Sequence, residues 1–109
     1  MKINVLAENL KKGLSIVMRG VSTRVQLPIL STILLKASKE GLVLSATDLE
    51  LSFRVKVRAK VSEEGEIAVP AKLFADLAAT LPVGVVDLSD KKQTLIIEGE
   101  KVRAEVVGQ

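Results

Sequence analysis

The hydrophobic period of the chain changes within its first twenty residues. Residues 2–6 alternate apolar and polar side chains, which is typical of a β-strand. From residue 8 to residue 19 apolar side chains recur every three or four residues, which indicates a helix, and Gly20 is a plausible stop for it. Its apolar face carries Leu10, Leu14, Val17 and Met18. Its other face carries Glu8, Lys12, Ser15 and Arg19.

Further along, the alternation changes phase. Residues 42–46 place apolar side chains at even positions, whereas residues 49–57 place them at odd positions. A strand cannot slip by one residue and keep its apolar side chains on one face. Asp48 can hydrogen-bond to the backbone two residues on, as turn residues do. The pattern therefore predicts a strand over 42–46, a turn or bulge at Thr47 and Asp48, and a long strand over 49–61.

The remaining segments complete a repeated order of elements. Strands are predicted over 29–37, 66–69, 84–88, 93–98 and 101–107. A second helix is predicted between Pro70 and Pro82, over residues 71–81. Its apolar face carries Leu73, Phe74, Leu77, Ala78 and Leu81.

The elements run strand, helix, strand, strand, strand, and then follow the same order again. We therefore expect one domain over residues 1–109, built from internal repeats over about 1–61 and 65–107. At an offset of 64 residues, four residues of the first repeat match the second: Ile3, Val5, Ala7 and Gly20 meet Ile67, Val69, Ala71 and Gly84. The predicted fold class is α+β, with two helices packed on antiparallel sheet and the core between the layers.

Composition narrows the chemistry that the chain can perform. It contains no Cys and no His, which excludes disulfides, thiolate nucleophiles and imidazole bases, and leaves a metal site only oxygen ligands. No segment has the roughly 20 apolar residues of a membrane span, and the first residues lack the apolar block of a signal peptide. We expect a cytoplasmic protein with no cofactor, no metal and no membrane contact.

The one arrangement that suggests an enzyme is the pair Asp48 and Glu50. Two carboxylates on one strand face can act as acid and base or bind a divalent cation. No third ligand, glycine-rich phosphate loop or positioned nucleophile accompanies them. The turn interpretation is favoured, so no catalytic residue is assigned and the chain is predicted not to be an enzyme.

The charge of the chain is concentrated in its first third. The formal net charge is +3. Residues 1–36 carry six cations against one anion, so this part has a net charge of +5 and the remainder −2. A weak overall charge alone does not indicate nucleic acid, but its distribution draws attention to the first helix.

Three local strings resemble one known family. They are Leu27-Pro28-Ile29-Leu30, Ala46-Thr47-Asp48-Leu49-Glu50-Leu51 and Val69-Pro70-Ala71-Lys72. In order and spacing they resemble the first domain of the bacterial DNA polymerase III β subunit, the sliding clamp, over residues 1 to about 107. The family subunit has three such domains, so the resemblance implies an N-terminal, DNA-clamp-like domain.

The resemblance implies a mechanical function in DNA replication. Two subunits of the family form a homodimeric ring around double-stranded DNA, with helices lining the hole and sheets on the outside. The full-length subunit binds the replicative DNA polymerase and the clamp loader, and so acts as a processivity factor. A ring that slides needs only weak, sequence-independent phosphate contacts. The family's peptide-binding site lies in the C-terminal part of the subunit, so this chain is expected to lack it.

The resemblance also assigns candidate sites. The DNA-binding candidates are Arg24, Lys12, Arg19, Lys11 and Lys72. Arg24 matches a position at which the family has a DNA-contacting arginine, and the others lie on the two helices. The subunit-interface candidates in the last strand are Lys101, Arg103, Ala104 and Val106, where the edge would pair with the next subunit. Without the family, solvated helix faces and an ordinary terminal strand remain the simpler interpretations.

A second basic group lies on the long strand. Arg54, Lys56, Arg58 and Lys60 alternate with apolar residues. On charge alone this ladder is a phosphate-binding candidate, but the resemblance implies that the sheets face away from DNA. A stand-alone nucleic-acid-binding or protein-interaction module therefore stays an alternative, and reversing the charges of the ladder or of the first helix separates the two hypotheses.

Overall fold

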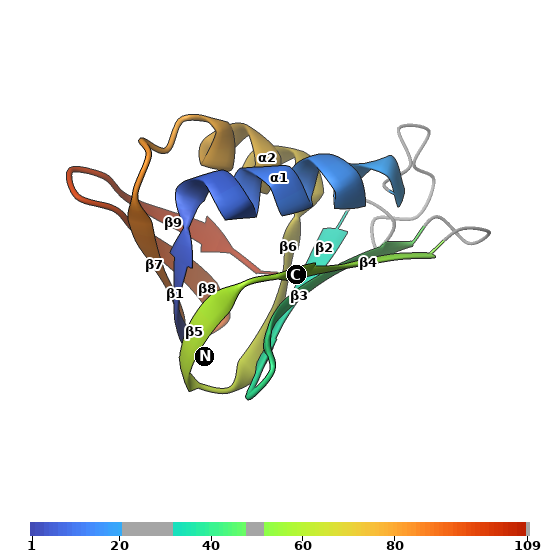
Figure 1. Ribbon diagram of the computed structural model, residues 1–109, viewed down its shortest axis with the longest axis horizontal. Helices are drawn as coiled ribbons and strands as arrows, with labels where there is room; N and C mark the ends of the chain where they lie inside the picture. The colour runs from blue at the N-terminus through green and yellow to red at the C-terminus, as the bar shows by residue number, and fades with distance from the viewer. Residues whose placement is uncertain (21–31, 48–51, 109) are drawn as a thin grey trace.

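The computed structural model describes residues 1–20, 32–47 and 52–108 (Figure 1). In these residues the elements follow the order β1 (Lys2–Leu6), α1 (Ala7–Val17), η1 (Met18–Gly20), β2 (Thr32–Ser38), β3 (Gly41–Thr47), β4 (Ser52–Val57), β5 (Ala59–Glu63), β6 (Gly65–Pro70), α2 (Ala71–Ala79), β7 (Val85–Lys91), β8 (Thr94–Glu98) and β9 (Arg103–Val107). Each predicted helix and strand has a counterpart in this list. The first helix is shorter than predicted, because its last turn tightens into a 3-10 helix.

The strands form two antiparallel sheets. One has the order β5-β1-β7-β8-β9 and the other the order β4-β3-β2-β6. Figure 1 shows α1 and α2 together on one side of the molecule, with the two sheets below them, and the helices contact each other. The α+β class and the packing of two helices on antiparallel sheet are therefore confirmed.

The predicted long strand over 49–61 is wrong in one respect. It is two strands, β4 and β5, which are separated at Arg58 and belong to different sheets. β4 pairs with β3, whereas β5 pairs with β1. The apolar side chains keep alternating through the break, because both strands turn the same side toward the one core. Periodicity therefore gives no sign of the change of sheet.

The phase change after residue 46 coincides with a reversal of the chain. β3 and β4 are antiparallel neighbours, and Thr47 is opposite Ser52 in their register. The chain therefore reverses direction between β3 and β4, and Thr47, which was predicted to lie in a turn or bulge, is the last residue of β3. Asp48 and Glu50 themselves lie outside the described residues, as do Arg24 and the string from Leu27 to Leu30.

The first strand of each expected repeat lies in the sheet of the other repeat. β1 pairs with β7, and β6 pairs with β2. Such an exchange is what two copies of one unit related by a two-fold rotation would produce. The internal repeats and their boundaries stay a prediction.

The core lies between the helices and the two sheets. Among the described residues the core consists of apolar side chains, with Thr32 as a buried polar residue at 9% exposure, and its largest buried member is Phe74, at 0% exposure. Helix α1 contributes Leu10, Leu14 and Val17, as predicted. In α2 the predicted face is wrong at Leu73, which is 54% exposed. The buried positions Ala71, Phe74 and Ala78 follow helical spacing, and Leu73 lies beside that stripe.

Gly13 brings α1 close to β4. A Cβ atom at this position would lie 2.6 Å from Cγ2 of Val57 and 3.3 Å from Cδ1 of Leu44. A helix can approach a neighbouring strand this closely only where it has no side chain. The role of Gly13 was not predicted from the sequence, although a glycine inside a helix is a recognised sign of close packing.

Candidate nucleic-acid interface

The two predicted cations of the first helix that lie opposite its apolar face are exposed. Lys12 lies in α1 and Arg19 in η1, and both side chains point to solvent while Leu10, Leu14 and Val17 are buried. The separation follows from helix geometry, because residues three and four apart share a face. The amphipathic pattern is thus confirmed, and its basic face is free of the core.

Lys11 differs from its neighbour Lys12. It is partly buried, and its Nζ donates a hydrogen bond to the backbone carbonyl of Leu81 at 2.7 Å. Lys11 also lines a groove between α1 and α2, together with Leu14, Met18 and Ala78. This ammonium is therefore engaged within the protein, across the boundary between the two helices.

Helix α2 carries one candidate cation in its first turn. Lys72 is exposed, and so is Asp76 one turn later. The pair leaves the exposed face of α2 close to neutral, whereas the face of α1 that carries Lys12 is basic. The exposed Leu73 further reduces the polar character of α2. The two helices are thus unequal contributors to a basic surface.

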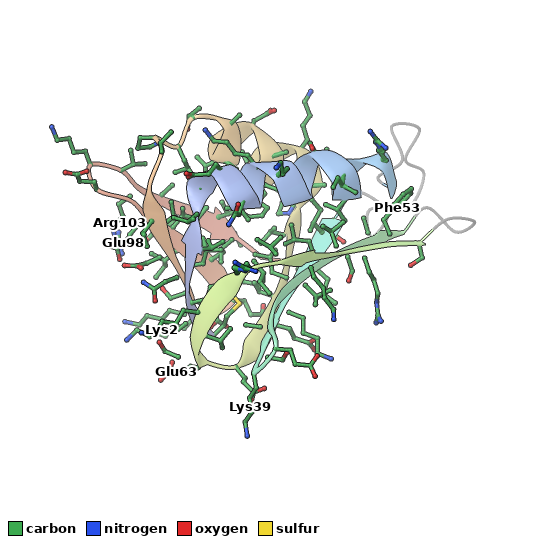
Figure 2. The ribbon with its side chains drawn as sticks, viewed as in Figure 1. Lys2, Lys39, Phe53, Glu63, Glu98 and Arg103 are labelled. Atoms are coloured by element: carbon green, nitrogen blue, oxygen red, sulfur yellow. The ribbon has the colours of Figure 1, made fainter. Side chains whose placement is uncertain are left out.

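The cations of β4 and β5, which were predicted to lie on one long strand, alternate with residues that pack on the core. Arg54 and Lys56 of β4 are exposed, whereas Val55 and Phe53, which is labelled in Figure 2, pack against the core. Lys60 of β5 is likewise exposed beside Ala59 and Val61, which pack against the core.

One part of this ladder lies near the first helix. A groove of about 310 Å³ between α1 and β4 is lined by Lys12, Lys56 and Arg58, together with the apolar Ile16 and Val55. No acidic side chain lines it. In the sequence, the basic ladder of residues 54–60 and the basic face of the first helix were separate features. The structure brings Lys56 near the end of β4 and the following Arg58 beside Lys12.

The predicted subunit-interface residues lie on and beside an edge strand. β9 pairs with β8 and is the last strand of the five-stranded sheet. Arg103 contacts Glu98 at 3.9 Å and Glu105 at 3.2 Å (Figure 2). Lys101 precedes the strand, Ala104 is partly buried and Val106 is buried at 2% exposure. The side chain of Val106 belongs to the core, so this residue offers a neighbour only its backbone.

Within residues 1–20, 32–47 and 52–108, no three Asp or Glu side chains are grouped so that they could hold a metal ion. Among the same residues no helix is long and apolar enough to cross a membrane.

Comparison with known proteins places this arrangement in a family. Residues 1–105 match the family described as DNA polymerase III beta subunit, N-terminal domain. The beta sliding clamp homolog GriR of Streptomyces muensis is 39% identical over 82 residues, which are 75% of this chain and 22% of that protein. The beta sliding clamp of Pseudomonas aeruginosa is 34% identical over 105 residues, which are 94% of this chain and 29% of that protein.

A solved structure agrees with the sequence relatives. Caulobacter crescentus pol III beta superposes with a TM-score of 0.93 at 33% sequence identity, and covers 100% of this chain and 30% of its own. This chain therefore spans less than a third of the length of each of these three proteins. The match in fold to the solved structure covers the whole chain, and the matching family is that of an N-terminal domain, which together confirm the resemblance drawn from three short strings. The chain belongs to the family of the DNA polymerase III beta subunit N-terminal domain.

Proposed function

We propose that this domain is one sector of a DNA sliding clamp, a cytoplasmic replication protein that encircles double-stranded DNA and tethers the replicative polymerase. The clamp would close as a homodimeric ring in the full-length subunit, which would also bind the clamp loader. The domain would have no enzymatic activity, cofactor or metal of its own. The observation that carries the proposal is the pair of adjacent helices, α1 and α2, whose apolar faces cover the core. Helix α1 and the following η1 turn Lys12 and Arg19 to solvent.

The expected phosphate contacts come from four of the five candidate cations. Lys12, Arg19, Arg24 and Lys72 would contact the DNA backbone without reading its sequence. Lys11, also a candidate from the sequence, has its ammonium bound to Leu81. Few contacts suffice because a closed ring holds DNA by topology, and weak contacts that exchange quickly allow sliding.

The same proposal assigns a role to the edge of the five-stranded sheet. We propose that β9 and the preceding Lys101 meet the neighbouring subunit, and that its backbone extends the sheet across the joint. Arg103 and Ala104 would lie at this joint. Binding of partner peptides would require the C-terminal part of the subunit, so titration of a clamp-binding peptide against the 109-residue chain should give no saturable binding.

Salt-dependent DNA binding tests the proposed interface. A short fluorescent duplex is titrated with the chain at several low salt concentrations, and log K is plotted against log salt. Neutralising Lys12 and Arg19 together, as Lys12→Gln and Arg19→Gln, should reduce the magnitude of the slope by about two, because each phosphate contact contributes about 0.9. The matched control neutralises Arg54 and Lys60 in the same way, and should leave the slope unchanged.

A second candidate function rests on the groove between α1 and β4. Because Lys56 and Arg58 flank Lys12 there, a stand-alone nucleic-acid-binding module that uses the basic ladder stays an alternative. Under this alternative a variant with Lys56→Gln and Arg58→Gln would lose DNA affinity, whereas Arg19→Gln alone would not. That result would overturn the clamp orientation while leaving DNA binding itself in place.

A further inference from the structure

Two consecutive lysines of α1 point to opposite flanks of the helix. Lys11 lines the groove toward α2, whereas Lys12 lines the groove toward β4. Neighbouring residues in a helix are about 100° apart around its axis, so this divergence follows directly from their positions. The ammonium of Lys11 reaches the backbone carbonyl of Leu81, which lies just beyond the end of α2 and is 70 residues away in the chain.

The C-terminal end of α2 benefits from a nearby cation. The last carbonyls of a helix have no partner within the helix, and the helix dipole gives this end a partial negative charge. The last turn of α2 contains no basic residue. Thr80 and Leu81 close this end with backbone bonds to Leu77 and Ala78, each 3.1 Å long. The ammonium of Lys11 adds a charge-assisted bond to the carbonyl of Leu81, two residues beyond the last residue of α2, and so holds the turn that closes the helix.

We propose that Lys11 is a positioning residue, which caps α2 from α1 and thereby fixes the end of one helix against the other. Leu81, which accepts the bond, is anchored by a side chain that is only 2% exposed, and Pro82 follows it. The bond therefore joins a fixed point of the core to α1. Its importance for DNA rests on the proposed function, since the capped helix end would otherwise add a partial negative charge beside the phosphates.

Hydrogen exchange in the 109-residue chain tests the cap. Lys11→Met keeps the aliphatic stem and removes the ammonium, Lys11→Arg keeps a cationic donor, and Lys12→Met is the matched control on the adjacent residue. Exchange of the Thr80 and Leu81 amides should accelerate about two- to fivefold in Lys11→Met. It should return to within about twofold of the original rate in Lys11→Arg and stay unchanged in Lys12→Met.

Three results would overturn the cap. They are unchanged exchange in Lys11→Met, equal acceleration in Lys12→Met, and acceleration of the β1 amides by the same factor as those of Thr80 and Leu81. The last would mark a general loss of stability in place of a local role. None of these outcomes depends on whether the chain binds DNA.

The salt dependence of duplex binding separates a cap from a phosphate contact. Lys12→Met should reduce the magnitude of the slope by about one, whereas Lys11→Met should leave the slope unchanged and lower only the affinity. A loss of about one in Lys11→Met would make Lys11 a phosphate ligand and overturn its role as a cap. If no helix variant alters binding, the proposed function fails, and the exchange rates still decide the role of Lys11.

Discussion

Replacing Gly13 by alanine tests how closely the first helix must approach the sheet. The new Cβ would lie 2.6 Å from Cγ2 of Val57 and 3.3 Å from Cδ1 of Leu44. Val57 cannot easily give way, because it is β-branched, only 4% exposed and held opposite Leu42 in the sheet. The helix must therefore move away from β4, or the valine must leave its preferred rotamer.

Two opposing terms set the size of the effect. Alanine is more favourable than glycine by about 1 kcal/mol in a helix interior. Overpacking a well-filled core costs about 1–3 kcal/mol. The contact with Val57 is short enough to place this site in the upper part of that range. We expect Gly13→Ala to lower the free energy of unfolding by about 1–2 kcal/mol, and the melting temperature by about 4–8 °C for each kcal/mol.

Urea unfolding followed by circular dichroism measures this difference. Ser15→Ala is the matched control, because Ser15 is exposed on the same helix, and its effect should stay within about 0.5 kcal/mol. The double variant Gly13→Ala/Val57→Ala removes the overlapping methyl group. Its loss should be smaller than the sum of the single losses by about 0.5 kcal/mol or more. A Gly13→Ala protein more stable than the original, or strictly additive losses, would refute the argument.

Four further substitutions test three other parts of the structure. Phe74→Ala should lower the free energy of unfolding by about 3–5 kcal/mol, because it empties a fully buried site. Leu73→Ala, on the exposed flank of the same helix, should lower it by less than about 0.5 kcal/mol. Urea unfolding measures both. Asp90→Asn should lower the free energy of unfolding by about 1 kcal/mol, because the Asp90 carboxylate contacts the amine of Met1 at 2.7 Å. In thermal melts, the difference in stability between this variant and the original protein should be smaller in high salt. In the full-length subunit, Val107→Asp on β9 should weaken the proposed dimer at least about tenfold in analytical ultracentrifugation. It should not lower the melting temperature, because the Val107 side chain is 70% exposed.

Each of these expectations has a contrary result. Equal losses at Phe74 and Leu73 would mean that α2 is rotated about its axis. A difference between Asp90→Asn and the original protein that does not change with salt would show that the contact with Met1 is not mainly electrostatic. An unchanged dimer in Val107→Asp would place the subunit joint away from this part of β9.

Local patterns predicted the elements well, because each helix and strand has one side in the core. The alternation of β1 and the helical spacing of α1 required nothing beyond the next few residues. The division between β4 and β5 was not predictable in this way, since Val55, Val57, Ala59 and Val61 continue one period across it. Which sheet a strand joins depends on its neighbour. β4 pairs with β3, which precedes it directly, whereas β5 pairs with β1, which is distant in sequence.

The candidate interface was predicted only in part, for a similar reason. Exposure of Lys12 follows from its helical position, so the sequence sufficed. The bond between Lys11 and Leu81 joins residues 70 positions apart, and the groove shared by Lys12 and Arg58 depends on how α1 lies against the edge of β4. Such contacts are set by packing, and a periodic pattern contains no information about them.

The way each helix starts explains how the surface can be both rigid and weakly binding. β1 ends at Leu6 and α1 begins at Ala7, while β6 ends at Pro70 and α2 begins at Ala71. With no loop at either junction, the sheets fix where both helices begin. The cations are thus held in place, yet they are few, and each phosphate contact is screened by salt. An isolated domain should therefore bind DNA very weakly, and effective retention on DNA would have to come from closing the ring.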